Sequence, residues 1–186
     1  MDFEFRYFGT IDVSAMRDKV ATSPLVDWNE YTFRQERFKA HRETKTVPII
    51  FDESFAKVTY RKCYDLFKVD LEAIRVELEK SLGRPGHFVR AILVNLPAGA
   101  WVPAHIDTGM SLTVCRRVHV PLFTNDRCFF AVGNDVRNLK VGEMWEINNA
   151  GKMHEVKNLG TTDRIHLIAD WMPDEPAAAE GASPGR

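Results

Sequence analysis

The 186-residue chain is poor in the features that mark secreted, membrane-spanning and nucleic-acid-binding proteins. Its three cysteines are widely spaced and form no Cys-x-x-Cys pair, so the sequence indicates neither a disulfide framework nor a thiolate zinc site. The 25 Lys and Arg residues balance 26 Asp and Glu residues, which leaves no basic excess to bind nucleic acid or an anionic membrane. No apolar run approaches the roughly 18 residues that a membrane-spanning helix needs.

The remaining composition is typical of a globular domain, with 45% hydrophobic and 27% charged residues. The first residues show no basic segment followed by an apolar one, so we expect no signal peptide and a cytoplasmic protein. The length predicts one domain, which we place at 1–172. Residues 173–186 are rich in Pro, Ala, Gly and Glu and predict a disordered tail.

Periodicity divides the chain into a helical and mixed first third and a β-rich body that begins at about residue 86. Leu71, Ile74 and Leu78 lie at helical spacing and predict a helix between about 69 and 82, which Gly83 ends. A shorter helix is expected around Met16 and Val20, and strands are expected over 3–7 and 47–51. Pro48 places the second of these strands at a sheet edge or at its own first residue.

The body contains seven short segments that are rich in Val, Ile and aromatic residues and are separated by turn residues. They are Phe88–Asn95, Trp101–His105, Cys115–Leu122, Cys128–Val132, Glu143–Ile147, Met153–Val156 and Arg164–Trp171. Because no helical segment separates them, they predict a mainly β fold, an antiparallel sandwich or jelly roll with flanking helices.

Four of the six histidines fall between residues 105 and 166, and this region contains a candidate metal site. His105 and Asp107 are two residues apart, so on a strand their side chains share a face and can bind one ion. His154 follows at the start of a predicted strand; taken alone, it fits a loop or core histidine better. Two His and one Asp are the ligands of non-haem Fe(II) oxygenases, which keep coordination positions open, whereas a structural zinc site has a fourth protein ligand.

Two predicted strands carry arginine and histidine on the face opposite to their aliphatic residues. Arg117 shares a face with His119, and Arg164 shares one with His166. An unpaired buried charge is costly, and a guanidinium binds a carboxylate bidentately, so Arg164 is a candidate for binding a dicarboxylic acid. For Arg117, an antiparallel strand with one solvated face explains the pattern as well.

The sequence also contains a set of motifs in a characteristic order and spacing. They are Pro103-Ala104-His105-Ile106-Asp107, Arg117-Val118-His119-Val120, Gly142-Glu143-Met144-Trp145, His154, Arg164-Ile165-His166-Leu167 and Asp170-Trp171, with a weaker similarity in His41-Arg42-Glu43-Thr44. With them, the run from Arg90 to Trp171 resembles the aspartyl/asparaginyl β-hydroxylase family of Fe(II)/2-oxoglutarate dioxygenases, which includes the bacterial free L-proline cis-4-hydroxylases.

This resemblance implies a double-stranded β-helix, a cupin-like jelly roll, whose mouth holds Fe(II). It implies His105, Asp107 and His154 as metal ligands and catalytic centre. Animal aspartyl β-hydroxylases lack the carboxylate ligand, so the presence of Asp107 makes the chain more similar to the proline hydroxylases.

The resemblance also implies the co-substrate site and the cofactors Fe(II), 2-oxoglutarate and O2. Arg164 is expected to bind the distal carboxylate of 2-oxoglutarate, and Arg117 and His119 match positions that line the co-substrate pocket in relatives. Which carboxylate each of the latter two meets stays open.

The expected function is therefore hydroxylation of an amino acid or an Asp/Asn-type residue, with decarboxylation of 2-oxoglutarate to succinate. The substrate is expected to be a small molecule or peptidyl, and its recognition is expected from loops at 108–114, 123–127 and 41–44. Two alternatives remain: a cupin-type metal dioxygenase or isomerase that does not use 2-oxoglutarate, and a non-catalytic jelly-roll binding module. The sequence indicates no particular oligomeric state.

Overall fold

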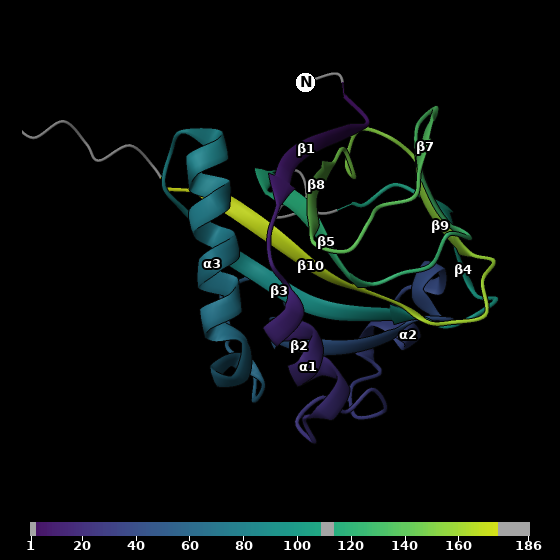
Figure 1. Cartoon of the computed structure of the whole chain (residues 1–186), viewed down its shortest axis with the longest axis horizontal. Helices are drawn as coiled ribbons and strands as arrows, with labels where there is room; N and C mark the ends of the chain where they lie inside the picture. Colours follow the sequence, from purple (N-terminus) through teal and green to yellow (C-terminus); the bar gives the residue numbers. More distant parts are fainter. Residues whose placement is uncertain (1–2, 109–113, 175–186) are drawn as a thin grey trace, which may run out of the picture.

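A computed structural model describes residues 3–108 and 114–174, which form two antiparallel sheets with helices packed around them (Figure 1). The elements in chain order are β1 (Phe5–Thr10), α1 (Ser14–Thr22), α2 (Phe33–Arg37), η1 (Lys39–His41), β2 (Lys45–Ile50), α3 (Tyr64–Leu82), β3 (Gly86–Leu96), β4 (Trp101–His105), β5 (Arg116–Phe123), β6 (Cys128–Val132), β7 (Asp135–Arg137), β8 (Glu143–Ile147), β9 (His154–Asn158) and β10 (Arg164–Pro173). All seven predicted strands of the body are present, and the mainly β fold class is confirmed.

The two sheets form a jelly roll. The larger has the strand order β1-β8-β5-β10-β3-β2 and the smaller has the order β4-β9-β6-β7, with every pair antiparallel. Apolar side chains from both sheets, among them Leu96, Phe130 and Val156, pack together between them. The strand that contains Pro48 lies at the edge of the larger sheet, as its proline predicts.

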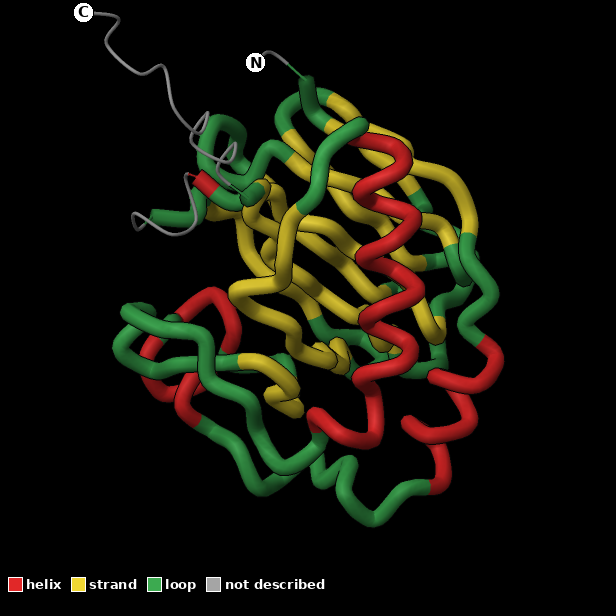
Figure 2. The backbone as a smooth tube through the Cα atoms, turned by 90° about the vertical axis from the view of Figure 1, so that its left-hand side faces the viewer, coloured by secondary structure: helices red, strands yellow, loops and turns green. Residues whose placement is uncertain are grey.

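Helix α3 covers the outer face of the larger sheet and lies across its strands (Figure 2). Its buried stripe of Leu71, Ile74 and Leu78 packs with aliphatic residues of β5 and β10. The helix begins five residues earlier than expected, because the fully buried Phe67 extends this stripe by one turn. It ends at Gly83, whose left-handed φ of 66° favours glycine.

Strand β10 lies in the middle of the larger sheet, between β3 and β5. Leu167 and Ala169 face the helices, so Arg164, His166 and Asp170 point into the space between the sheets. On β5, Val118, Val120 and Leu122 likewise face the helices, which leaves Arg117 and His119 on the inner face. Both predicted pairs of Arg and His therefore lie inside the barrel.

Some elements differ from the expectations. Strand β7 is only three residues long, too short for periodicity to reveal, and α2 with η1 lies in a stretch whose polar and aromatic residues show no helical pattern. Pro173 is still the last residue of β10, paired with Gly86, and the rest of the expected tail, 175–186, lies outside the described residues.

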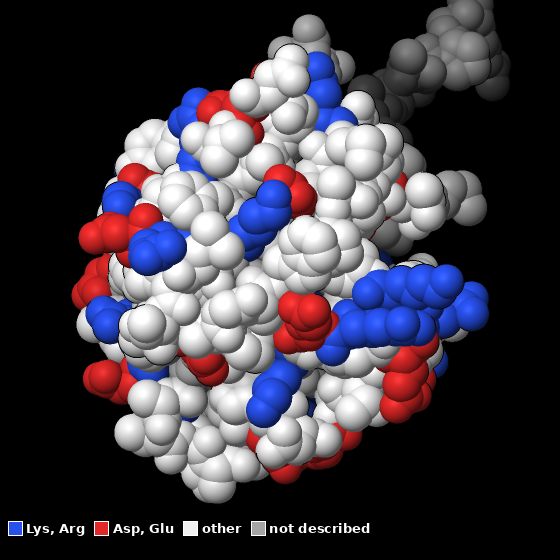
Figure 3. Space-filling model, turned by 90° about the vertical axis from the view of Figure 1, so that its right-hand side faces the viewer, with Lys and Arg blue, Asp and Glu red and all other residues white. Residues whose placement is uncertain are grey.

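The helices and the charged surface bear on interactions with membranes and other partners. No helix within 3–108 and 114–174 is both long enough and apolar enough to cross a membrane. Basic and acidic side chains are mixed over most of the face shown in Figure 3, apart from a group of Lys and Arg at one edge.

The packing of α3 predicts a large difference between two truncations on the same helix. Leu78→Ala is expected to lower the free energy of unfolding by about 2–5 kcal/mol, because it leaves a cavity against the sheet. Val69→Ala, at a side chain that is 71% exposed, is expected to change it by less than about 0.5 kcal/mol. Urea denaturation measures both, and equal losses would contradict this packing.

Candidate active site

The pairing of β4 with β9 brings the two predicted histidine ligands together. His105 and His154 are Cα partners in this register, and their ring centroids are 4.2 Å apart. Asp107 follows the end of β4, where its backbone N–H donates to Asn149 O at 3.0 Å. One ligand atom from each of His105, Asp107 and His154 lies within 4.8 Å of the others, so the structure places the three side chains around one point.

The hydrogen bonds of both imidazoles leave their Nε2 atoms available to a metal. His105 Nδ1 lies 2.8 Å from Pro103 O and His154 Nδ1 lies 3.5 Å from Lys152 O, and a carbonyl oxygen only accepts. The Nε2 atoms then carry lone pairs and face Asp107, at 3.8 Å from Oδ1 and 3.9 Å from Oδ2 respectively. Burial lowers the pKa of His154 to about 4 although Asp107 opposes the shift, so this ring is neutral, as a ligand requires.

Asp107 is held from one side by two donors. Arg117 Nη1 and Asn149 Nδ2 both donate to its Oδ2, the second at 3.0 Å. Burial disfavours the charged form, but Arg117 outweighs it, with His154 and Asn149 contributing, and the pKa of Asp107 falls below its usual range. Two imidazoles and one ionised carboxylate form a donor set that fits Fe(II).

Arg117 belongs to a row of alternating charges, Arg90, Asp170, Arg117 and Asp107, which we call the charge network. Asp170 is the Cα partner of Arg90 on one neighbouring strand and of Arg117 on the other. Its carboxylate accepts from Arg117 Nε at 2.8 Å, from Arg117 Nη2 at 3.0 Å and from Arg90 Nη1 at 2.9 Å. Asp107 and Asp170 together engage three of the five N–H donors of Arg117, so its first role in the site is to orient Asp107.

We call His105, Asp107 and His154 the metal-ligand cluster. Arg164 lines a narrow pocket whose lining also includes His105 and His154 of this cluster. We call it the inner pocket; its walls include Val94, Leu96, Val102, Phe130, Val156 and Ile168. Arg164 is 4% exposed, donates to His166 Nδ1 at 2.9 Å and lies over the Phe130 ring. No acidic residue of the described chain pairs with it, and burial lowers its pKa to about 10.

His119 lines the same pocket, as expected, and its two ring nitrogens have no hydrogen-bond partner among the described residues. Burial, strengthened by the nearby Arg164, lowers its pKa well below the ordinary value. A neutral imidazole offers one donor and one acceptor, so His119 can bind a polar ligand in this pocket.

A second, larger space adjoins the inner pocket and has a volume of about 610 Å³; we call it the outer cavity. Arg34, His41, His105, Arg117 and Ile168 line both spaces and mark their junction. Two of the three loops expected to recognise a substrate contribute here, through His41, Thr44 and Thr108. Residues 123–127 line neither space, and 109–113 lie outside the described residues.

Sequence reasoning missed several residues around the outer cavity. Arg34 and Phe38 come from α2 and its C-terminal end, and Phe51 and Phe55 follow β2. The signal available was the density of aromatic and basic residues over 28–39, which a surface segment shares. His41, quoted only as a weak similarity, has its ring centroid 5.4 Å from that of His105; burial, with Arg34 contributing, lowers its pKa to about 2.

Comparison with known proteins assigns the family. Residues 71–173, more than half of the chain, match the family described as "Aspartyl/Asparaginyl beta-hydroxylase". The chain belongs to this family. The match includes the metal-ligand cluster, Arg117 and Arg164, whereas Arg34 and the Phe residues of the outer cavity precede it.

Solved structures show the same fold at low sequence identity. A prolyl-4-hydroxylase from Pseudomonas putida is 13% identical with a TM-score of 0.55, covering 92% of this chain and 94% of that one. An oxidoreductase of the 2OG-Fe(II) oxygenase family from Burkholderia pseudomallei is 13% identical with a TM-score of 0.57, covering 69% of this chain and 66% of that one. No curated protein sequence matches the chain.

The charge network predicts that Asp170→Asn is strongly destabilising. We expect a loss of about 3–5 kcal/mol in the free energy of unfolding, because Arg90 and Arg117 lose their shared counter-ion in a buried setting. The matched control is Asp65→Asn, whose carboxylate is 85% exposed and pairs with Lys68; its expected loss is below about 1 kcal/mol. Chemical denaturation measures the free energy of unfolding of both variants. A small loss for Asp170→Asn would contradict the stabilising role of the ion pairs that Asp170 makes with Arg90 and Arg117.

Proposed function

We propose that the protein is an Fe(II)- and 2-oxoglutarate-dependent dioxygenase that hydroxylates an amino acid or an Asp/Asn-type residue. The observation that carries this proposal is a metal-ligand cluster with one carboxylate and two imidazoles, from which a pocket leads to a buried arginine without an acidic partner among the described residues. Membership of a family described as hydroxylases supports it.

His105, Asp107 and His154 would hold the iron. The cluster has no fourth His, Cys, Asp or Glu within the described part of the chain, so coordination positions stay open for a co-substrate and O2. Bound Fe(II) supplies the oxidising chemistry: one atom of O2 enters a substrate C–H bond as hydroxyl, while the other enters succinate as 2-oxoglutarate loses CO2. The chain's own contribution is to hold Asp107 ionised, through Arg117 and Asn149.

The inner pocket matches a linear dicarboxylate. Arg164 would bind the distal carboxylate, because its planar donors pair with a carboxylate and its burial otherwise leaves a charge uncompensated. His119 supplies a further polar contact, and the aliphatic walls pack against the methylene groups. Arg117 is also expected to line the 2-oxoglutarate site. Two of its five N–H groups are not used in the hydrogen bonds to Asp107 and Asp170, so these two could donate to the co-substrate.

Loss of a metal ligand is expected to abolish turnover. The measurement is O2-dependent formation of succinate from 2-oxoglutarate by anaerobically iron-loaded protein, with and without a panel of amino acids and Asp- or Asn-containing peptides. His105→Ala and Asp107→Ala are expected to lose activity and Fe(II) affinity together, whereas His87→Ala, at an exposed histidine paired with Asp174, keeps both. Full activity in Asp107→Ala would disprove the metal assignment, and tight Fe(II) binding without succinate formation in the wild type would favour a metal enzyme that does not use 2-oxoglutarate.

Arg164→Gln is expected to weaken 2-oxoglutarate binding by about 10- to 100-fold, the range for a lost charged hydrogen bond. Fe(II) affinity should stay unchanged, since Arg164 makes no contact with the three ligands. Titration calorimetry of the anaerobic iron complex measures both affinities, and Arg164→Lys should recover part of the loss. Wild-type affinity in Arg164→Gln would show that another residue binds the distal carboxylate.

A further inference from the structure

Arg34 is a second buried arginine for which the described residues provide no counter-ion. It is 7% exposed, and within 3–108 and 114–174 its side chain makes one hydrogen bond, from Nη1 to Thr46 Oγ1 at 3.2 Å, and no ion pair. Burial, together with the nearby Arg117, lowers its pKa to about 10. Because it lies at the junction of the inner pocket and the outer cavity, its uncompensated charge faces the space that a substrate would occupy.

The charges around the outer cavity leave a positive excess. The buried Arg34, Arg90 and Arg117 stand against two carboxylates, Asp107 and Asp170, and both carboxylates already pair with Arg117 or Arg90. A divalent metal ion on Asp107 increases this excess. An anionic group beside Arg34 would neutralise part of it.

The same charges disfavour an ammonium group. Asp107 is the one acidic residue among the described residues that line the outer cavity, and it is committed to Arg117 and to the metal-ligand cluster. The described lining therefore offers a free amino acid cationic partners for its carboxylate, of which Arg34 is the buried one without a counter-ion, and no uncommitted carboxylate for its ammonium.

Part of the wall of the outer cavity is apolar and is formed by aromatic and aliphatic side chains. Phe51 and Phe55 pack against each other with ring centroids 5.7 Å apart, and the guanidinium of Arg90 lies 4.8 Å from the Phe55 ring centroid. Phe55 adopts a left-handed φ of 58°, which is strained for a bulky residue and which its packing maintains. Phe38 and Ile106 extend this wall toward the opening.

We propose that the outer cavity binds a small carboxylic acid with an apolar body whose amino group is absent or acylated, and that Arg34 binds its carboxylate. This proposal rests on the proposed function and narrows its substrate class. Among amino-acid substrates, the outer cavity is expected to bind N-acylated amino acids in preference to free ones. Arg34, Phe38, Phe51 and Phe55 all precede the region that matches the family, so this selectivity is a property of the chain's own first third.

Three probes separate the roles of carboxylate and ammonium. N-acetyl-L-leucine carries the carboxylate alone, L-leucine carries both charges, and N-acetyl-L-leucinamide carries neither. Titration calorimetry is performed on iron-loaded protein under anaerobic conditions with saturating 2-oxoglutarate, so that no probe occupies the site of Arg164. We expect N-acetyl-L-leucine to bind at least about 10-fold more tightly than either other probe, the effect of one charged hydrogen bond. Equal or tighter binding of L-leucine, or no binding of N-acetyl-L-leucine, would overturn the proposal.

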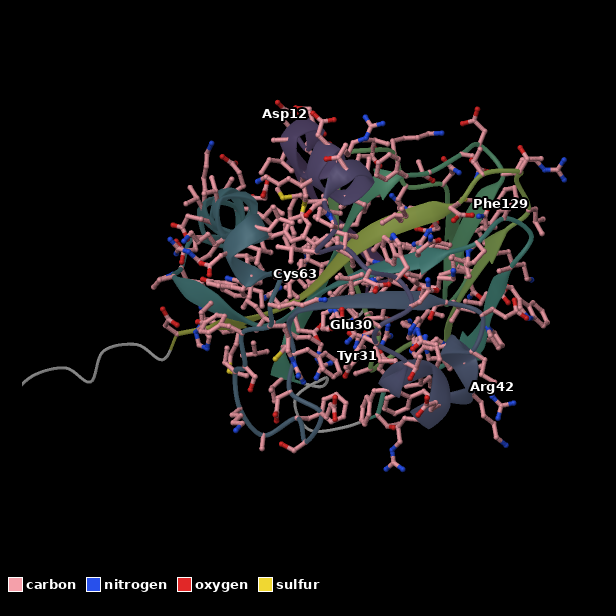
Figure 4. All side chains as sticks on the ribbon, turned by 90° about the horizontal axis from the view of Figure 1, so that it is seen from below. Asp12, Glu30, Tyr31, Arg42, Cys63 and Phe129 are labelled. Atoms are coloured by element: carbon pink, nitrogen blue, oxygen red, sulfur yellow. The ribbon has the colours of Figure 1, made fainter. Side chains whose placement is uncertain are left out.

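Variants then assign the carboxylate to Arg34. Arg34→Gln is expected to weaken the binding of N-acetyl-L-leucine by about 10- to 100-fold and to leave the binding of N-acetyl-L-leucinamide unchanged. Arg34→Lys keeps the charge and should recover part of the affinity. The matched control is Arg42→Gln, because Arg42 is exposed at the edge of the molecule and lines neither space (Figure 4).

Two readouts keep the outcomes apart. An unchanged circular dichroism spectrum and an unchanged affinity for N-acetyl-L-leucinamide show that Arg34→Gln is folded, and an unchanged N-acetyl-L-leucine affinity in that folded variant would refute the role of Arg34. A wild type that neither binds nor converts 2-oxoglutarate would refute the proposed function, whereas one that converts it but prefers L-leucine would refute this inference alone.

Discussion

The structure depends on the alternation of charge along Arg90, Asp170, Arg117 and Asp107. Four charged side chains at this density cannot be buried singly, because each would lose its hydration without compensation. The register of the central strand solves this problem, since Asp170 is the Cα partner of Arg90 on β3 and of Arg117 on β5. The charge network ends at Asp107, whose Oδ2 is occupied by Arg117 and Asn149, so its other oxygen is left to face His105. The geometry of the metal-ligand cluster thus follows from sheet register, together with the contacts that Asn149, in the turn between β8 and β9, makes with Asp107.

Two further buried arginines, Arg34 and Arg164, do not take part in this alternation of charge. Arg90 and Arg117 are neutralised by acids of the chain, whereas Arg164 and Arg34 have none among the described residues. The buried carboxylates thus pair with the arginines that connect neighbouring strands, and the two buried arginines without a carboxylate partner among the described residues line the pockets. Arg164 lines the inner pocket alone of the two spaces and Arg34 lines both, which matches two anionic ligands bound side by side.

The sequence was informative where chemistry coincides with strand periodicity. Alternation on β5 and β10 placed Arg117, His119, Arg164 and His166 on the face opposite to their aliphatic neighbours, which the structure shows to be the inner face. The family resemblance named the three residues that the pairing of β4 with β9 brings together. The sequence did not reveal that Arg117 pairs with Asp170. Cross-strand partners depend on the register between two strands, and the pattern within one strand does not determine that register. Arg34 was missed for a similar reason: in a five-residue helix, burial is imposed by neighbours from β2 and β4, and no period marks the buried side.

The division between strand and loop also separates chemistry from selectivity. Most of the residues that would hold the iron and 2-oxoglutarate lie on strands that pair on both sides, where a change of backbone position is costly. His105 and Asp107 lie on and just after β4, an edge strand that among the described strands pairs with β9 alone. The residues that shape the outer cavity lie on α2, on the segment after β2 and after β4, where the backbone makes fewer ladder hydrogen bonds. A fixed oxidising centre can then be combined with different walls, and Arg34 is the residue at which the two meet. Its charge lies close enough to Arg117 and Asp107 to influence the centre, yet its position depends on the part of the chain that the family match does not include.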